Sequence, residues 1–138
     1  MTYGELLDLY FSRSVSLQAY WTIYVVVIGG LLAFSSLRKQ PDAITGVLVS
    51  ILFACFAWKN LGAIGDVIAQ RNALHAAIVA YQPPSVDATD IPRIRSAVEP
   101  TLQTQDFAGV RTFHLSCDVL VLAALWAMEL RRRRAAKG

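Results

Sequence analysis

The residues of this chain whose types allow chemistry are a few ionisable side chains set within or beside apolar stretches. His114 and Asp118 are four residues apart in the apolar run 113–130, so they share one face of a helix. Lys59 directly follows the apolar stretch 43–58. We count 1.5 Å per helical residue from Ala43 and Leu130, the ends of these runs on the inner side of the membrane. Asp118 then lies about 18 Å above the inner boundary, and Lys59 and His114 lie about 24 Å above it. A hydrocarbon core is about 30 Å thick, and ionisable groups inside it are usually paired or functional.

Three kinds of chemistry fit these side chains. A buried ion pair or hydrogen bond of Asp118 with Lys59 or His114 docks the third apolar helix on the second, and this interpretation is favoured. The alternative is an ion or proton path through Asp118 and His114. His114, Cys117 and Asp118 are suitable metal ligands by type, but no second His/Cys pair with ligand spacing completes a site. We therefore expect no metal, no other cofactor and no catalytic residue, and we expect Cys55 and Cys117 to be small buried apolar residues.

Three long apolar runs position these side chains and indicate an all-α polytopic membrane protein with three transmembrane helices. We predict spans at 17–37, 43–64 and 113–130, each close to the roughly 20 residues that cross a bilayer. With 55% hydrophobic and 17% charged residues, the 138-residue chain is poor in charge for a water-soluble domain. It is expected to form a single membrane domain, 1–138. No basic patch interleaved with aromatic residues is present, so nucleic acid is not an expected partner.

Two basic clusters predict the orientation of the chain. Arg38 and Lys39 lie in the short loop after the first span, and the tail 131–138 opens with Arg131, Arg132, Arg133 and Arg134. With three spans, this loop and this tail share one side, which the positive-inside rule assigns to the cytoplasm. We expect a multi-pass protein with its N-terminus outside, in the cell inner membrane if it is bacterial, and with the first span retained as an anchor. The four arginines act as a stop-transfer signal and are candidates for contact with anionic lipid at the membrane surface.

The second span carries a stripe of small residues that recur mostly at four-residue steps. Its members are Gly46, Ser50, Ala54, Gly62, Gly65, Ala69 and Ala73. Small residues let another helix backbone approach closely, so the stripe predicts a helix-packing seam. No proline interrupts residues 43–82, and Pro83-Pro84 then ends the pattern. A helix of about forty residues is about 60 Å long, twice the thickness of a hydrocarbon core, so we expect it to project beyond the bilayer.

Two short amphipathic segments are predicted on the outer side. Residues 1–16 place an apolar face on one side of a helix and are predicted to lie along the membrane interface, the alternative being the first turns of an overlong first span. The face consists of Tyr3, Leu6, Leu7, Tyr10 and Phe11. Residues 83–112 are predicted to be an outer loop with a short helix, capped at Thr89 or Asp90 and interrupted at Pro100. The apolar stripe of that helix is Ile91, Ile94, Val98 and Leu102.

Two limited resemblances follow from these features. Gly109-Val110-Arg111 with His114 and Asp118 resembles part of the Gly-x-Arg-His…Asp segment of succinate dehydrogenase cytochrome b subunits, which also have three spans. Two extra residues separate Arg111 from His114, and Arg13-Ser14-Val15-Ser16 lacks the histidine that the family has before its first span. We therefore do not infer haem or quinone binding for this chain from the resemblance. The three-span plan with a basic tail also resembles class I phage holins in topology.

These features favour a small integral membrane protein that acts as an oligomerising or accessory subunit. Its expected partners are the lipid bilayer and either further copies of itself or a larger membrane complex. The alternative is a pore-forming or ion-conducting protein, holin-like or a small channel, that uses Asp118 and His114. A further alternative is a membrane-anchor subunit of a respiratory complex. An enzyme is not expected, because the sequence has no nucleophile–base–orienter set and no phosphate-binding glycine loop.

Overall fold

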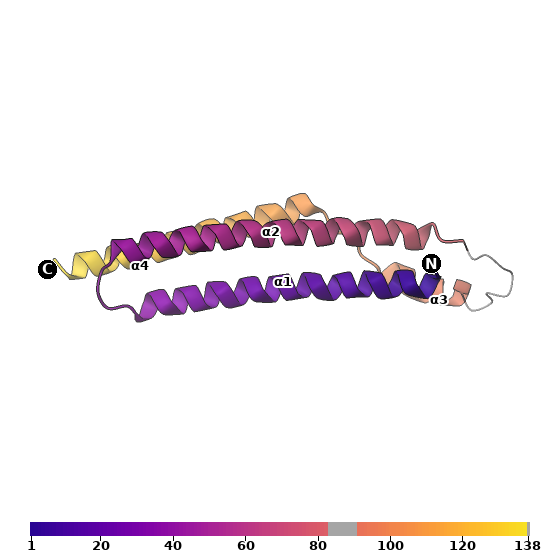
Figure 1. Cartoon of the computed structure of the whole chain (residues 1–138), viewed down its shortest axis with the longest axis horizontal. Helices are drawn as coiled ribbons and strands as arrows, with labels where there is room; N and C mark the ends of the chain where they lie inside the picture. The colour runs from indigo at the N-terminus through magenta and orange to yellow at the C-terminus, as the bar shows by residue number, and fades with distance from the viewer. Residues whose placement is uncertain (83–90, 138) are drawn as a thin grey trace. The chain divides into compact units, whose positions relative to one another are not determined.

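The computed structural model describes residues 1–82 and 91–137, and all regular structure in these ranges is helical. The elements in chain order are α1 (Tyr3–Leu37), α2 (Ala43–Val79), α3 (Ile91–Val98), the 3₁₀ turn η1 (Glu99–Thr101) and α4 (Phe107–Ala135), as drawn in Figure 1. Three of them, α1, α2 and α4, are long and apolar enough to cross a membrane. The predicted all-α fold with three spanning helices is confirmed at this level, and these are the helices of a multi-pass membrane protein.

The second long helix begins where the sequence predicts, because Asp42 caps its first turn. Asp42 Oδ1 accepts hydrogen bonds from the backbone N–H groups of Ile44 at 3.0 Å and Thr45 at 3.2 Å. Asp42 Oδ2 accepts the Thr45 hydroxyl at 2.5 Å. The hydroxyl of Thr45, followed by its backbone N–H, holds the pKa of the exposed Asp42 carboxyl below its usual range.

The same helix ends at Val79, before the predicted end at residue 82. Arg95 accounts for this end, because its Nη2 donates to the carbonyl oxygens of Ile78, Val79 and Tyr81 at 3.1, 3.2 and 2.8 Å. Cationic side chains that bond the last carbonyls stabilise a helix terminus. The predicted proline stop at 83–84 and the predicted cap at 89 or 90 lie outside the described residues.

The first long helix is longer than its apolar run. α1 is continuous from Tyr3 to Leu37, so the predicted division between 1–16 and 17–37 is not observed. Two serines near that division lie within the helix, and each hydroxyl donates to the carbonyl oxygen four residues earlier. These bonds join Ser14 to Tyr10 at 2.9 Å and Ser16 to Ser12 at 3.1 Å.

The last long helix also extends past the predicted span 113–130. α4 begins at Phe107 and continues to Ala135, so most of the predicted tail 131–138 is helical. Arginine has a high helix propensity, and cations are favoured in the last turn by the helix dipole.

The chain forms two compact units, which are described separately. Unit 1 comprises Met1–Ala19 and Ile64–Phe107. Its buried core consists of Tyr3, Leu6, Tyr10, Ile78 and Leu102. The apolar face predicted for residues 1–16 is therefore used largely for packing on protein, although Phe11 stays half-exposed.

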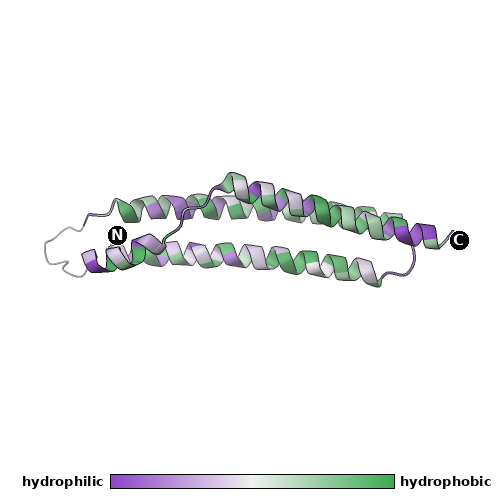
Figure 2. Ribbon diagram, turned by 180° about the vertical axis from the view of Figure 1, so that it is seen from behind, coloured by the Kyte–Doolittle hydropathy of each residue, from purple (hydrophilic) through white to green (hydrophobic). Residues whose placement is uncertain are grey.

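Unit 2 comprises Tyr20–Ala63 and Ala108–Gly138. Its buried core consists of Tyr24, Phe53, Ala57, Val121 and Leu125. Figure 2 shows the hydrophilic colour gathered at the C-terminal end of α4, beyond a largely hydrophobic stretch. Large apolar side chains such as Val26, Leu52 and Leu120 are mostly exposed on this unit. A surface of this kind suits a lipid environment rather than water.

Candidate functional site

A buried polar network joins the three long helices within unit 2. α1 supplies Tyr24, α2 supplies Asn60, and α4 supplies His114 and Asp118. His114 is fully buried, Tyr24 and Asn60 are 2% and 6% exposed, and the side chain of Asp118 is 14% exposed. Polar groups at this depth require hydrogen-bond partners, and each of the four has one within the network.

The polar atoms of the network form a continuous row. The Tyr24 hydroxyl donates to Asp118 Oδ1 at 2.7 Å, and His114 Nδ1 lies 2.9 Å from Asp118 Oδ2. Asn60 Nδ2 lies 3.4 Å from His114 Nε2. An amide nitrogen can only donate, so this contact fits the tautomer in which Nε2 accepts and Nδ1 donates to the carboxylate.

Aromatic rings enclose the imidazole of His114. The ring of Tyr24 lies 4.1 Å from it between centroids, with 33° between the planes. The ring of Trp21 lies 5.8 Å from it. In such an apolar enclosure each hydrogen bond is electrostatically stronger than in water, and each unpaired polar atom is more costly.

Of the three residues predicted to form a buried polar group, only two lie together in the structure. His114 and Asp118 are paired, whereas Lys59 is exposed and its neighbour Asn60 takes the inward position. An α-helix turns by about 100° per residue, so Lys59 lies on a different face of α2 from Asn60. An asparagine within an apolar helix is a signal that could have identified Asn60. Nothing local distinguishes Tyr24 from the other aromatic residues of α1.

The cysteines also differ from their expectation. Both are free thiols, but Cys55 is exposed and only Cys117 is partly buried against the unit 2 core. Cys55 therefore lies on the outer surface of α2 rather than in a core.

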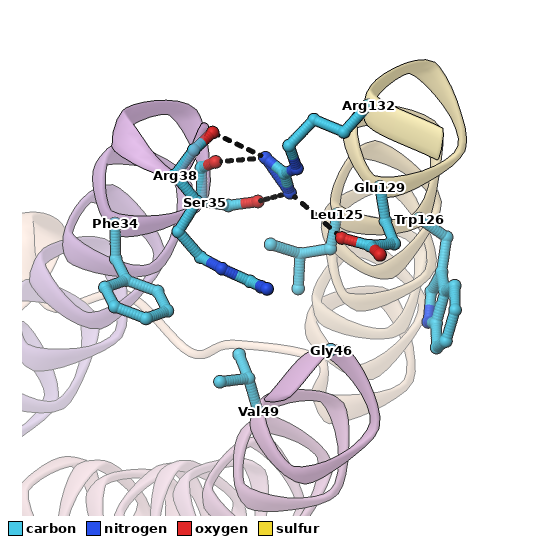
Figure 3. A pocket seen from close by; sticks show the side chains of 9 residues that line it. All are labelled: Phe34, Ser35, Arg38, Gly46, Val49, Leu125, Trp126, Glu129 and Arg132. Carbon is cyan, nitrogen blue, oxygen red and sulfur yellow. Dashed lines mark hydrogen bonds and ion pairs between the residues drawn. The ribbon is translucent and has the colours of Figure 1, made fainter. Parts of the chain in front are cut away.

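A second polar cluster, which sequence reasoning missed, lies at the C-terminal end of α4 (Figure 3). Glu129 is 2% exposed, and its carboxylate lies 3.5 Å from Arg132 and 3.3 Å from Arg133. Arg132 Nη1 donates to the carbonyl oxygen of Ser35 at 2.6 Å and to that of Arg38 at 3.5 Å. Arg132 thereby bonds carbonyl groups that the end of α1 leaves free. The predicted membrane-surface arginines thus differ in role, because two of them are partners of Glu129 while Arg131 and Arg134 are exposed.

Unit 1 has its own polar contacts around Arg71. Its guanidinium donates to the Tyr10 hydroxyl at 2.9 Å and to Gln105 Oε1 at 3.2 Å. Asn72 Nδ2 donates to the carbonyl oxygen of Gln105 at 2.9 Å. These bonds hold the segment after η1 against α2 within the unit.

The small residues of the predicted seam differ in what surrounds them, because some are packed against other side chains and others are exposed. A Cβ on Gly65 would lie 2.9 Å from the ring of Phe107 in unit 1, and one on Gly46 would lie 3.9 Å from Trp126 in unit 2. A Cβ on Gly62 would meet nothing within 4 Å. Four members of the stripe are exposed, namely Ala54, Gly62, Ala69 and Ala73, whereas Ser50 is half-buried. Part of the stripe therefore serves packing within each unit, and part of it is exposed.

The network can do two things chemically. Its hydrogen bonds tie the three helices of unit 2 together, and they link two proton donors, Tyr24 and His114, through the acceptor Asp118. Within residues 1–82 and 91–137, no group of three or more His, Cys, Asp and Glu side chains is placed to hold a metal ion. No protein-family model, no curated protein and no solved structure matches this chain.

Proposed function

We propose that this protein is an oligomerising accessory subunit of a membrane assembly. In this proposal unit 2 spans the bilayer and associates with a second copy through the face of α2 and α4 around Trp58. The N-terminus lies outside, and the C-terminus lies in the cytoplasm.

The distribution of charge in α1 and α2 supports this placement. Residues 20–37 of α1 carry no charge, and residues 43–63 of α2 carry only Lys59. α2 has 37 residues, a length of about 56 Å, which exceeds a hydrocarbon core of about 30 Å. Its remaining part carries Asp66 and Arg71, so it is suited to water on the outer side.

The charges of α4 agree with the same placement. Arg111 and Arg131 are twenty residues apart (131 − 111 = 20), or about 30 Å along a helix. The two acidic residues between them, Asp118 and Glu129, both have close partners. The arginines that follow Leu130 then belong with Arg38 on the cytoplasmic side.

The face around Trp58 is the observation that carries the proposal. A groove of about 850 Å³ lies between α2 and α4, and its lining is mainly apolar, including Trp58, Leu61 and Leu115. Trp58 is 74% exposed and stands between Ala54 and Gly62 at four-residue spacing. A face that presents both a protruding side chain and a groove can pair with itself about a twofold axis. Tryptophan is among the residues that contribute most to such interfaces.

Leucine substitutions beside Trp58 test the proposal. Neither Ala54→Leu nor Gly62→Leu fills space inside the monomer, because Ala54 is exposed and a Cβ on Gly62 meets nothing within 4 Å. Both variants are expected to lose the oligomer, measured by crosslinking in membranes and by native mass spectrometry in detergent. Gly29→Leu on α1 is the matched control, since a Cβ there also meets nothing within 4 Å. Wild-type assembly in both α2 variants would contradict self-association through this face.

Proton or ion conduction is a second candidate, favoured by the row of polar atoms from Tyr24 through Asp118 to His114. Asp118→Asn keeps the size of the side chain and removes its negative charge. If the network conducts, this variant lowers proton flux into liposomes loaded with a pH-sensitive dye. Equal proton flux through the variant and the wild-type protein would show that Asp118 is not part of a conduction path.

A further inference from the structure

A groove lined by three arginines lies in unit 2, at the C-terminal ends of α1 and α4. Its volume is about 290 Å³, and its lining residues are Ser36, Arg38, Met128, Arg131, Arg132 and Ala135. We call it the arginine groove. It is distinct from the polar network around Asp118 and from the face around Trp58.

The arginine groove has more positive than negative charge around it. Its lining contains no acidic residue. The nearest acidic groups are Glu129, which is buried and shared between Arg132 and Arg133, and Asp42, which lies 3.8 Å from Arg38. No hydrogen bond or ion pair joins the Arg131 side chain to any described residue. Three guanidinium groups in one hollow repel one another unless an anion lies between them.

Two of these arginines are already held in place. Arg132 is fixed by its bonds to Ser35, including one from Nη2 to the serine hydroxyl at 3.3 Å, and its buried Nε has no hydrogen-bond partner among the described residues. Arg38 donates from Nη2 to the carbonyl oxygen of Asp42 at 3.1 Å. Guanidinium groups match phosphate oxygens in a planar fork, and arginines fixed beforehand lose less freedom on binding.

The position of the groove suits a lipid headgroup. Arg131 directly follows Leu130, the last residue of the apolar stretch of α4, and Met128 and Ala135 give the groove an apolar wall. Basic residues that end a spanning helix lie at the level of the phosphates of the cytoplasmic leaflet.

We propose that the arginine groove binds the phosphate group of an anionic phospholipid. Arg131 and the N–H groups of Arg38 that do not bond Asp42 donate to the phosphate, and Arg132 supplies a fixed positive charge beside it. This site is independent of self-association through the Trp58 face.

The test measures binding of single lipids to the full-length purified protein by native mass spectrometry. Phosphatidylglycerol and phosphatidylcholine are titrated in detergent at about 0.15 M salt, where unspecific attraction is screened. We expect the wild-type protein to prefer phosphatidylglycerol, and we expect Arg131→Gln and Arg38→Gln each to weaken its binding roughly five-fold or more. Arg134→Gln is the matched control, because it removes the same charge from the same run but does not line the groove. Binding of phosphatidylglycerol to the Arg134→Gln variant should change less than two-fold.

Two results would overturn the proposal. An equal loss in Arg131→Gln and Arg134→Gln would mean that the basic run attracts lipid without a site. Displacement of the lipid by millimolar inorganic phosphate, with no preference between the two lipids, would assign the groove to free phosphate. Retention of phosphatidylglycerol under the same phosphate, with the loss confined to the groove variants, supports the lipid site.

Discussion

The hydrogen bond from Tyr24 to Asp118 allows a quantitative test of whether the polar network holds unit 2 together. Tyr24→Phe removes one hydroxyl and keeps the ring that packs on His114. Asp118 Oδ1 then loses a donor at 2.7 Å, while His114 still bonds Oδ2 at 2.9 Å. Tyr24 is only 2% exposed, so water has little access to replace the lost donor.

The size of the effect follows from the charge and burial of the acceptor. Hydrogen bonds between helices in membranes contribute about 0.6 kcal/mol on average and up to about 1.7. Bonds to charged groups contribute about 1.5–3 kcal/mol in soluble proteins. We expect Tyr24→Phe to lower the free energy of unfolding by about 1.5 kcal/mol, roughly a tenfold change in the unfolding equilibrium.

The assay is reversible unfolding in mixed micelles with rising dodecyl sulfate, followed by tryptophan fluorescence. Trp21 is a local reporter, because its ring lies 5.9 Å from that of Tyr24. Tyr20→Phe is the matched control, since Tyr20 lies one turn earlier on α1 and contributes no hydrogen bond to the network. A double-mutant cycle with Asp118→Asn should give a coupling energy of about 1 kcal/mol. If the coupling is below about 0.3 kcal/mol and Tyr24→Phe behaves like Tyr20→Phe, the network does not stabilise unit 2 as reasoned.

Three further predictions concern the helix ends and the small residues. Gly65→Leu should destabilise unit 1 by about 2–3 kcal/mol, because a Cβ there already lies 2.9 Å from an aromatic ring, whereas Gly62→Leu should leave the monomer's thermal unfolding unchanged. Arg95→Gln should speed hydrogen exchange in the last turn of α2 by about ten-fold or more, since it removes the side-chain donor to three carbonyl oxygens; Arg93→Gln, at an exposed position, should not. The pKa of Asp42 is lower in the folded chain than in the unfolded chain, where it is about 3.9. The stability that the Asp42 cap gives α2 is therefore fully present above the unfolded pKa and is lost as the pH falls through the folded pKa. Protection factors of the first-turn amides of α2 should therefore fall in acid, and Asp42→Asn should abolish that pH dependence; a wild-type profile in the variant would exclude the cap as its origin.

The number and kind of the elements could be predicted because they depend on local properties. The length of each apolar run decides whether a helix can cross a bilayer, and that length is read directly from the chain. The start of α2 at Ala43 is equally local, because Asp42 lies next to the amides that it caps. The start of α1, the end of α2 and both ends of α4 were harder to predict. Helices extend beyond apolar runs wherever nothing stops them, and α2 ends where a residue sixteen positions later (95 − 79 = 16) reaches its carbonyl groups.

The candidate site was predictable only in part, for a geometric reason. His114 and Asp118 are one turn apart on the same helix, so their pairing follows from helix spacing alone. Their partners on the other helices depend on how each helix is rotated about its axis, which a single sequence does not record. A rotation of 100° separates the inward Asn60 from the exposed Lys59.

That this chain is a helical membrane protein with three spans follows from its residues alone, because hydropathy and helix rise are properties of each segment. Three other facts depend on how the helices pack: Asn60 and Tyr24 complete the buried network, the ring of Phe107 fills the space beside Gly65, and Arg132 joins the end of α4 to that of α1. Each of these facts concerns residues more than thirty positions apart. Contacts over such separations depend on how the helices pack, not on the local pattern of the chain.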